Sequence, residues 1–494
     1  MHSSSFHSCH CTAFYSKVSS FQTLSGFREG LLREGIQIGL ASDAVPGKVM
    51  SSPLSCCGRT PGNRWAILPM EGWDCTRDGA PGEYTRRRWL RFASSGAKLI
   101  CGTEAAAVMH RGRSNPRQLL VSEHTLDALK SLCSEMRRVH RESSGTDKDL
   151  LIGLQLTHSG RFSHPDDPQK ALPSTAYAHP LLDKKFHCGK ENVLTDREIG
   201  EIVQAFVRGA VIAQKAGFDF VDIKHAHGYL AHEFLSAVER KGPYGGSFEN
   251  RTRFFREIAS GIRKACPGLN LAMRLSLFDL IPFVKDEQNG LGVPMDWEGS
   301  YPFAFGGDGT GRGMDPDLRE PAEFIRMAHQ EYGVDLICAT VGSPYYNVHL
   351  QRPAYYAVSD GYLPPEHPLL NVARHIDAVK RIRELCSPEI RFVGSGYSCL
   401  QEYLPNAAEY SVAHGLTDFV GIGRMALSYP DFCSDILAGR SPDRRRICRT
   451  FGDCTNAPRA GLVSGCYPLD EFYRRLPGAE ELKELKLRAK GRIS

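Results

Sequence analysis

The chain has 494 residues, of which 41% are hydrophobic and 24% are charged, values typical of globular proteins that bury a sizeable core. The formal net charge of +5 is small for this length and does not indicate nucleic-acid binding. No apolar run approaches the roughly 18 residues that span a bilayer. Sixteen cysteines in so long a chain favour buried, reduced thiols over a disulfide framework.

The first thirty residues are rich in serine and contain no acidic residue before Glu29. This composition resembles an organelle transit peptide, although such peptides usually carry more arginine than the single Arg28. The alternative is an undistinguished disordered tail. We therefore predict a partly disordered N-terminal extension over residues 1–52. The location would be organellar if this segment is a transit peptide, and cytoplasmic otherwise.

Short apolar runs alternate with amphipathic stretches along most of the chain, and eight of these runs are candidate strands. Several are nearly continuous in apolar residues, as expected for parallel strands that are covered on both faces. The candidates are residues 64–70, 98–103, 150–157, 220–225, 269–276, 336–340, 390–394 and 418–421. Eight strand and helix units predict an α/β fold of the (β/α)8 TIM-barrel type. A doubly wound open sheet is the alternative.

The clearest helix begins after Thr195, where T-D-R-E forms a capping box with Glu198 and apolar residues follow at helical spacing. Further helices are predicted at residues 321–331, 370–385 and 400–414. Residues 286–320, rich in glycine and acidic residues, do not fit the repeat and predict a loop lid or decoration. We predict a barrel over residues 53–442 and a tail over 443–494 that ends in a helix at 479–490.

The stretch VDIKHAHGYLAHEF, residues 221–234, places polar side chains at the end of a buried strand. If Phe220–His225 is the fourth barrel strand, Lys224 and His227 lie at its carboxyl end and face the pocket, with Tyr229 just beyond. Histidine and tyrosine can donate hydrogen bonds to a developing oxyanion, and tyrosine can also deliver a proton. These three are candidate catalytic residues, the alternative being that they merely cap the barrel.

The run that starts at Phe218 and includes YGGSFENRTRF, residues 244–254, resembles the Old Yellow Enzyme family of FMN-dependent ene-reductases. That family is related to dienoyl-CoA reductase and trimethylamine dehydrogenase. The resemblance covers roughly residues 53–438. It implies a flavin barrel that takes hydride from NAD(P)H and acts on a small molecule, with no nucleic-acid or membrane partner. Assembly as a homo-oligomer is compatible with it.

The same resemblance implies flavin contacts at the ends of the first strands. LPMEGWD, residues 68–74, matches the first strand, and LQLTHSG, residues 154–160, matches the third. In the motif AMRLS, residues 272–276, the positive charge of Arg274 would stabilise the anionic reduced flavin. The residues concerned are Pro69, Met70, Glu71, Gly102, Gln155 at the flavin pyrimidine, and Arg274 beside flavin N1 and O2.

Two later motifs resemble the loops that bind the FMN phosphate. They are VGSGYS, with Ser395 and Gly396, and GIGRMAL, with Gly423 and Arg424. The resemblance implies that backbone amides and the Arg424 side chain contact the phosphate, in the usual position after barrel strands seven and eight.

Two positions depart from the family pattern. Lys224 stands where relatives have the first residue of a His/His or His/Asn pair that holds the substrate oxygen, with His227 at the second position. Glu71 stands where relatives have a threonine or cysteine that tunes the flavin potential. A carboxylate there should disfavour the reduced anion unless it is protonated or paired. We therefore hypothesise that Glu71 pairs with Lys224.

The substrate side is expected in VGSPYYNVHLQRP, after the sixth strand. Tyr345, Tyr346 and His349 are the candidate substrate-binding residues. Their aromatic rings could sandwich a flat, conjugated substrate or simply pack the loop.

The cysteines of the tail raise the question of a [4Fe–4S] cluster. Cys454 and Cys466 keep the spacing of the last two cluster ligands in the dienoyl-CoA reductase group, but the first two would fall on Ile447 and Thr450. Cys448 is close but leaves three thiols and no C-x2-C step. We therefore expect packed thiols, with neither a cluster nor another metal.

The sequence leads to the hypothesis of an FMN-dependent oxidoreductase that takes hydride from NADH or NADPH and reduces an electron-poor, α,β-unsaturated substrate. Lys224 and His227 would hold its carbonyl group, and Tyr229 would protonate the α-carbon. Three alternatives remain: oxidative chemistry such as amine demethylation on the same flavin, a Schiff-base lyase that uses Lys224 as nucleophile, and a flavin-binding barrel without turnover.

Overall fold

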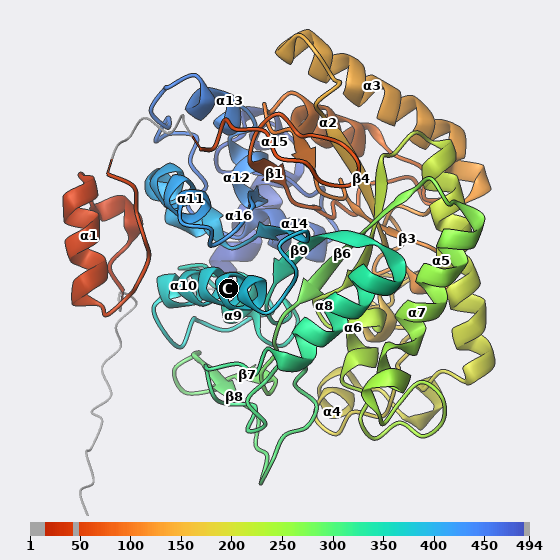
Figure 1. Ribbon diagram of the computed structural model, residues 1–494. Helices are drawn as coiled ribbons and strands as arrows, with labels where there is room; N and C mark the ends of the chain where they lie inside the picture. The colour runs from red at the N-terminus through yellow and green to blue at the C-terminus, as the bar shows by residue number, and fades with distance from the viewer. Residues whose placement is uncertain (1–14, 43–48, 489–494) are drawn as a thin grey trace, which may run out of the picture.

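The protein is a closed parallel β-barrel surrounded by helices (Figure 1), seen in a computed structural model that describes residues 15–42 and 49–488. Every neighbouring pair of barrel strands is parallel, and pairing of β2 with β4 and of β1 with β11 closes the ring. The strands are β1 (Trp65–Ile67), β2 (Leu99–Ile100), β4 (Leu151–Thr157), β5 (Phe220–His225), β6 (Asn270–Ser276), β9 (Val334–Thr340), β10 (Arg391–Gly394) and β11 (Phe419–Ile422). This confirms the predicted (β/α)8 barrel, and the open-sheet alternative is wrong.

The barrel strands alternate with helices that cover the outside of the ring. The larger helices are α2 (Glu83–Ala93), α3 (Leu126–Ser144), α5 (Asp196–Lys215), α7 (Phe248–Ala265), α8 (Arg319–Tyr332), α10 (Pro368–Glu384) and α11 (Leu404–Ala413). Shorter ones are α4 (Leu182–Phe186), α6 (Leu230–Leu235), α9 (Val348–Gln351), α12 (Arg424–Ser428) and α13 (Phe432–Leu437). A short strand, β3 (Ala105–Ala107), adds to β4 beyond β2.

Local sequence explains where these helices start. Thr195 caps α5 as predicted: its hydroxyl accepts from the Glu198 amide, and the Glu198 side chain reaches back to Thr195. The helix predicted from residue 400 begins later, at Leu404. Residues Tyr397–Tyr403 form a 3₁₀ helix, η6, in which Gln401 takes a left-handed φ of 52°, and this breaks the α-helical ladder.

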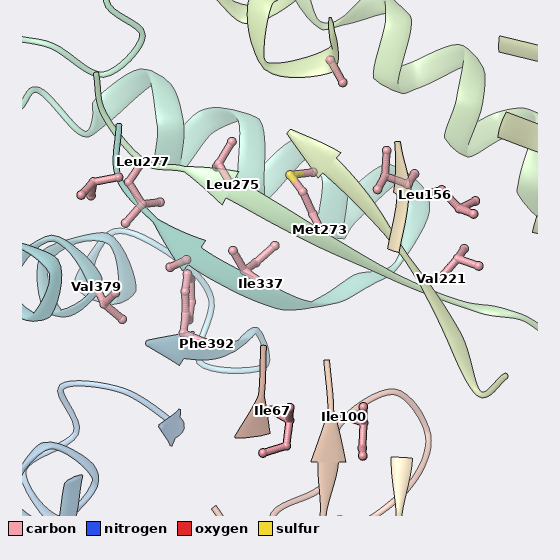
Figure 2. Packing of buried hydrophobic residues seen from close by; sticks show 14 of the residues in the cluster. Ile67, Ile100, Leu156, Val221, Met273, Leu275, Leu277, Ile337, Val379 and Phe392 are labelled. Carbon is pink, nitrogen blue, oxygen red and sulfur yellow. The ribbon is translucent and has the colours of Figure 1, made fainter. Parts of the chain in front are cut away.

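The core has an inner and an outer layer because successive strand residues point to opposite faces. On β5, Phe220 belongs to the cluster inside the barrel, whereas Val221 and Ile223 pack in the outer cluster beneath the helices. Figure 2 shows part of this outer cluster, including Val221 and Met273. Further up the inner face of β5 come Asp222 and Lys224. The inner surface is therefore apolar at the bottom and polar at the carboxyl ends of the strands.

An antiparallel hairpin that the sequence did not indicate spans the start of the segment predicted as a lid or decoration: β7 (Phe283–Lys285) lies just before it, and β8 (Gly292–Pro294) lies within it. The rest of this segment, up to Arg319, has no helix or strand. Three-residue strands are too short for an alternating pattern to stand out.

Both ends of the described chain pack on the barrel. Helix α1 (Leu24–Arg33) buries Phe27 and Leu31 in the main core, so this part of the extension is not the tail that composition suggested. After the barrel come α14 (Asp453–Arg459), α15 (Glu471–Arg474) and α16 (Gly478–Arg488). Residues 1–14, 43–48 and the end of the predicted terminal helix lie outside the described residues. Among the described helices, none is both long and apolar enough to cross a membrane.

Candidate active site

A layer of polar side chains lies at the carboxyl ends of adjacent barrel strands. Gln155 on β4 is in register with Asp222 on β5, and Lys224, two residues further, is in register with Arg274 on β6. All four are buried. Because residues two apart on a strand share a face, Asp222 and Lys224 both point into the barrel above Phe220.

Glu71, on the loop after β1, accepts hydrogen bonds from four side chains at this end of the barrel. Its Oε1 lies 2.8 Å from Lys224 Nζ, which confirms the predicted pairing. Tyr229 donates its hydroxyl to the same carboxylate, 3.2 Å from both oxygens. Trp73 Nε1 (3.1 Å) and Ser114 Oγ (3.2 Å) donate to Glu71 Oε2. The carboxylate is thus held by one ammonium group and three neutral donors.

Tyr229 lies between Lys224 and Tyr345. The Lys224 ammonium sits 3.6 Å from the centre of the Tyr229 ring, and the hydroxyls of Tyr229 and Tyr345 are 3.0 Å apart. Burial raises the pKa of Tyr229 well above its ordinary value, with the Glu71 charge adding to the effect. Burial lowers the pKa of Lys224, and Glu71 opposes that shift. Tyr229 is therefore a protonated phenol at neutral pH.

His227 adopts a left-handed backbone conformation, with φ of 68°, just past the end of β5. The turn is fixed by two serines: Ser276 Oγ accepts from the His227 amide (3.1 Å), and Ser343 donates to the His227 carbonyl (2.7 Å). Gln351 Nε2 donates to His227 Nε2 over 3.0 Å. Burial, aided by the charges of Arg274 and Lys224, lowers the pKa of His227 well below its usual range. The imidazole is therefore neutral.

Several polar atoms of the layer are buried without a partner. Gln155 Nε2 donates to Asp222 Oδ2 over 2.6 Å, but Asp222 Oδ1 and Arg274 Nε have no hydrogen bond. Burial raises the pKa of Asp222 to about 6, against the Gln155 hydrogen bond and the Arg274 charge. Gly102, with φ of 96°, brings the loop after β2 close: a Cβ there would lie 2.9 Å from Pro69 Cγ. Such orphaned groups indicate a polar ligand that caps the layer.

The loops after β10 and β11 lie beside each other on the same rim. Ser395 Oγ donates to His375 Nδ1 over 3.1 Å, and Gly396 takes a left-handed φ of 90°. Gly423 precedes α12, and the side chain of Arg424 follows. Arg424 Nη1 is buried without a hydrogen-bond partner. An anion bound at these loops would satisfy it.

The predicted substrate residues fall into two places. Tyr345 stacks on Phe162 at 3.9 Å and joins Tyr229, whereas Tyr346 donates its hydroxyl to Asp279 over 2.6 Å. His349 makes a different contact: its Nδ1 lies 2.8 Å from the Tyr362 hydroxyl, and it packs on Phe283. Its described contacts do not join His349 to Lys224, His227 or Tyr229.

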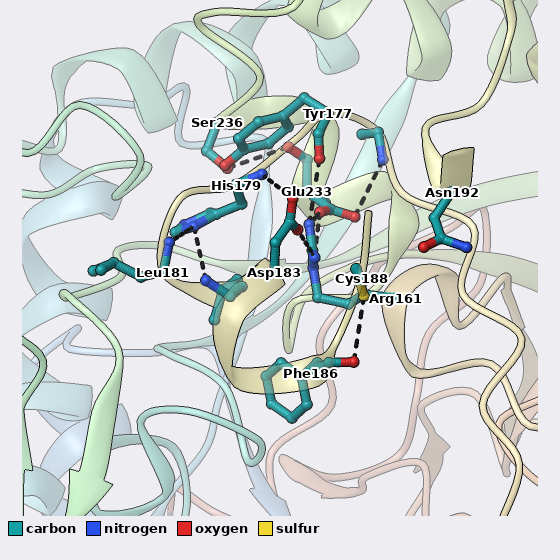
Figure 3. A network of polar contacts seen from close by, with 12 residues as sticks. Arg161, Tyr177, His179, Leu181, Asp183, Phe186, Cys188, Asn192, Glu233 and Ser236 are labelled. Atoms are coloured by element: carbon teal, nitrogen blue, oxygen red, sulfur yellow. Dashed lines mark hydrogen bonds and ion pairs between the residues drawn. The ribbon is translucent and has the colours of Figure 1, made fainter. Parts of the chain in front are cut away.

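A buried ion-pair network holds the segment that carries Phe162 (Figure 3). Arg161 forms ion pairs with Glu233 on α6 and with Asp183 on α4. Its Nη2 also donates to the Tyr177 carbonyl over 3.3 Å, and Tyr177 in turn contacts Ser236. The network connects the long segment between β4 and α5 to α6, the helix that follows Tyr229. It therefore holds Phe162 in place beside Tyr345 and Tyr229.

The chain matches known flavin enzymes in sequence. A profile of the NADH:flavin oxidoreductase / NADH oxidase family matches residues 52–290. An NADPH dehydrogenase from Bacillus pumilus (strain SAFR-032) is 32% identical over 248 residues, which are 49% of this chain and 68% of that protein. The chain belongs to the NADH:flavin oxidoreductase family.

Another relative is similar in sequence, and two solved structures are similar in fold. An NADPH dehydrogenase from Geobacillus sp. (strain WCH70) is 36% identical over 238 residues, 47% of this chain and 65% of the relative's length. The fold resembles that of 2-naphthoyl-CoA reductase, with a TM-score of 0.63 and 19% identity over 88% of this chain and 58% of that one. The fold also resembles that of an Old Yellow Enzyme homologue from Zymomonas mobilis, with a TM-score of 0.54 and 19% identity. That match covers 81% of this chain and 98% of the other one.

The tail cysteines surround a small cavity of about 20 Å³. It is lined by Cys448, Cys454 and Cys466 together with Arg424. The counted-back ligand positions are Ile447 and Thr450, so this lining offers three thiols where a [4Fe–4S] cluster held by cysteines alone needs four. This donor set does not fit a [4Fe–4S] cluster held by cysteines alone. Elsewhere among the described residues, Asp74, Cys75 and Glu104 converge, but the Arg88 guanidinium already pairs with both carboxylates.

Several residues of the site were missed from the sequence. Asp222 could have been found, because it lies two residues before Lys224 on the same strand and must share its face. Gln351 lies within the predicted substrate segment VGSPYYNVHLQRP but was not singled out there. Ser114 and His375 reach the site from a loop and a helix whose sequence neighbourhoods carry no signal of these contacts.

Proposed function

We propose that this member of the NADH:flavin oxidoreductase family is an FMN-dependent enzyme that takes hydride from NADH or NADPH and reduces the double bond of an electron-poor, α,β-unsaturated compound. The observation that carries the proposal is the polar layer of Gln155, Asp222 and Arg274, in which Asp222 Oδ1 and Arg274 Nε are buried without hydrogen-bond partners. This layer lies next to loops suited to a phosphate. Residues 53–442 would form the flavin-binding unit.

The residues present fit FMN. Gln155 donates its amide N–H to Asp222, which leaves its carbonyl oxygen free to accept from the flavin pyrimidine. Arg274 supplies a buried cation with an unpartnered Nε, and Arg424 supplies an unpartnered Nη1 for the phosphate. Backbone groups of Pro69, Met70, Gly102, Ser395, Gly396 and Gly423 would complete the binding site. When bound, FMN would accept hydride from the nicotinamide and pass it to the substrate.

The chain's own residues would bind the substrate and supply a proton. Lys224 and His227 would hold the carbonyl oxygen, with Lys224 positioned by its ion pair with Glu71. Tyr229, a phenol kept protonated by burial, would give its proton to the α-carbon as hydride reaches the β-carbon. Tyr345 and Tyr346 would line the pocket. The net change is addition of one hydride from NAD(P)H and one proton across the double bond.

The test is a visible spectrum of the purified protein, followed by heat release and identification of the chromophore. We expect FMN, and bleaching of its absorbance when NADH or NADPH is added without oxygen. Reoxidation by an α,β-unsaturated ketone or ester would then support the substrate class. A colourless protein that FMN cannot reconstitute would overturn the proposal.

Lys224 also supports one rival function. Burial lowers the pKa of its ammonium, as a Schiff-base lyase requires. A carbonyl compound trapped on Lys224 by borohydride would favour a lyase. If Lys224 only binds an oxygen atom of the substrate, the borohydride experiment should leave Lys224 unmodified.

A further inference from the structure

Arg352 directly follows α9 and is linked to both candidate phosphate loops, to the first of them through His375. The Leu350 carbonyl, within α9, accepts from His375 Nε2 over 3.0 Å. His375 in turn accepts from Ser395 of the first loop. On the other side of Arg352, the Pro353 carbonyl accepts from Arg424 Nη2 of the second loop over 2.9 Å. Arg352 is therefore tethered to each loop through its sequence neighbours.

The guanidinium of Arg352 has no counter-charge. Its Nη2 is shielded from solvent and makes no hydrogen bond, as is true of Arg424 Nη1. Burial, together with the neighbouring charge of Arg424, lowers the pKa of Arg352 to about 10. Among the ion pairs of the described residues, none includes Arg352 or Arg424. Two like charges are thus held close together without a carboxylate.

Nearby groups do not neutralise this pair. Arg459 is a third cation in the vicinity, but it forms an ion pair with Asp360. The Cys448 thiol is also close, and burial raises its pKa, so it stays neutral. A buried cation without a partner is costly, whereas a guanidinium beside a phosphate gains charge-assisted hydrogen bonds. The two buried guanidinium groups of Arg352 and Arg424 therefore favour the binding of an anion that carries more than one negative charge.

We propose that Arg352 is a second cationic ligand, beside Arg424, for the phosphate of FMN. This inference rests on the proposed function, and it names a residue for which neither the strand-end pattern nor the phosphate-loop motifs give a signal. A phosphate monoester carries close to two negative charges at neutral pH and offers several acceptor oxygens to two guanidinium forks. Arg352 should therefore select FMN over riboflavin, which has no phosphate.

The experiment measures the dissociation constants of FMN and riboflavin by quenching of flavin fluorescence, using flavin-free protein. Three chains are compared: the natural one, Arg352→Gln and the control Arg459→Gln, which removes a nearby cation that already has a carboxylate partner. We expect Arg352→Gln to weaken FMN binding about ten- to a hundredfold and to leave riboflavin binding unchanged. Arg459→Gln should change neither by more than about twofold.

A thermal-unfolding measurement separates ligand binding from a structural role. Without flavin, Arg352→Gln should unfold at the same temperature as the natural protein or a higher one, because it removes an uncompensated charge. With saturating FMN it should gain less stability than the natural protein. Inorganic phosphate should compete with FMN less well in Arg352→Gln, whereas a free anion site remote from the flavin would bind phosphate without competition and would overturn the proposal.

The remaining outcomes also decide the matter. Equal weakening of FMN and riboflavin, or lower stability of flavin-free Arg352→Gln, would assign Arg352 a packing role and contradict the inference while leaving the proposed function intact. Unchanged FMN affinity would contradict it in the same way. Failure of the natural chain to bind either flavin would remove the proposed function itself, and the inference with it.

Discussion

Lys224 Nζ and Glu71 Oε1 are 2.8 Å apart, so the first position of the proposed oxygen-binding pair is an ammonium group paired with a carboxylate. The resemblance to the Old Yellow Enzyme family implies a histidine at the Lys224 position in relatives and a threonine or cysteine at the Glu71 position. The exchange of both residues adds one positive and one negative charge, and the local net charge is preserved. Each of the two buried charges is neutralised by the other, which explains why both residues can occupy this site.

Glu71→Gln should raise the reduction potential of bound FMN. The substitution removes a negative charge near the flavin and leaves Lys224 positive, so the anionic reduced flavin becomes more stable. A change of about 1.4 kcal/mol corresponds to about 30 mV for a two-electron couple. The potential is measured by dye-equilibrated anaerobic titration. Glu83→Gln, which changes an exposed carboxylate on α2, serves as control, and an unchanged potential in Glu71→Gln would count against the role of Glu71.

Tyr229→Phe should slow oxidation of the reduced enzyme by an unsaturated substrate about 10²- to 10⁴-fold, because the proton donor is lost. Reduction by NAD(P)H should keep its rate, since that step needs no proton from Tyr229. Stopped-flow absorbance measures the two half-reactions separately. Tyr177→Phe removes a buried hydroxyl that contacts Ser236 instead, and should spare both steps. Equal slowing of both half-reactions in Tyr229→Phe would exclude the proton-donor role.

Asp222→Asn should change how stability depends on pH. The pKa of Asp222 is about 6 in the folded chain and 3.8 in its ordinary state, so the folded protein binds this proton more tightly. The free energy of unfolding of the flavin-free protein therefore falls as pH rises through this window, by about 3 kcal/mol from this group. Asp222→Asn should lack that decrease.

Urea unfolding at pH 4 and pH 7 tests this prediction. The stability difference between variant and natural protein should shift in favour of Asp222→Asn at the higher pH. Asp166→Asn, at a carboxylate with 74% of its side chain exposed, should show no such shift. A parallel pH dependence of Asp222→Asn and the natural protein would disprove the raised pKa.

Arg161→Gln should destabilise the fold by about 3–5 kcal/mol, because it leaves Glu233 and Asp183 without their common cation in a buried network. The matched control is Arg197→Gln, whose exposed pair with Glu201 on α5 should contribute less than about 0.5 kcal/mol. Chemical denaturation measures both. A loss near that of the control would mean that the network in Figure 3 contributes specificity of structure more than stability.

The barrel could be predicted because short runs rich in apolar residues alternate with amphipathic stretches, and the predicted strand Phe220–His225 has the bounds that the structure shows. The hairpin of β7 and β8 was missed since its strands have only three residues each. Helix α1 was not predicted because the serine-rich composition of this end is typical of a disordered segment. Phe27 and Leu31 nevertheless have the four-residue spacing of a buried helix face.

The site was predictable where a residue follows a strand and unpredictable where it arrives from elsewhere. Lys224 near the end of β5 and Tyr229 just beyond it could be placed from the strand itself, and charge alone suggested the partner of Lys224. His349 follows a strand too, but its contact with Tyr362 depends on a loop whose path the sequence does not reveal. Arg352 shows the same limit, because what distinguishes it is the absence of a partner, and that is a property of the folded chain.

Helix α1 acts as a cover for the wall beside the Ser395 loop. Phe27 stacks on Tyr403 of η6 at 4.3 Å, and the Tyr403 hydroxyl donates to the carbonyls of Phe21 and Thr23. A protease that trimmed the chain after Arg33 would expose an aromatic face and leave the Tyr403 hydroxyl without its acceptors, close to the Ser395 loop that we propose binds the FMN phosphate. Such trimmed molecules should self-associate and lose flavin, so proteolytic integrity at this end would govern the quality of any preparation.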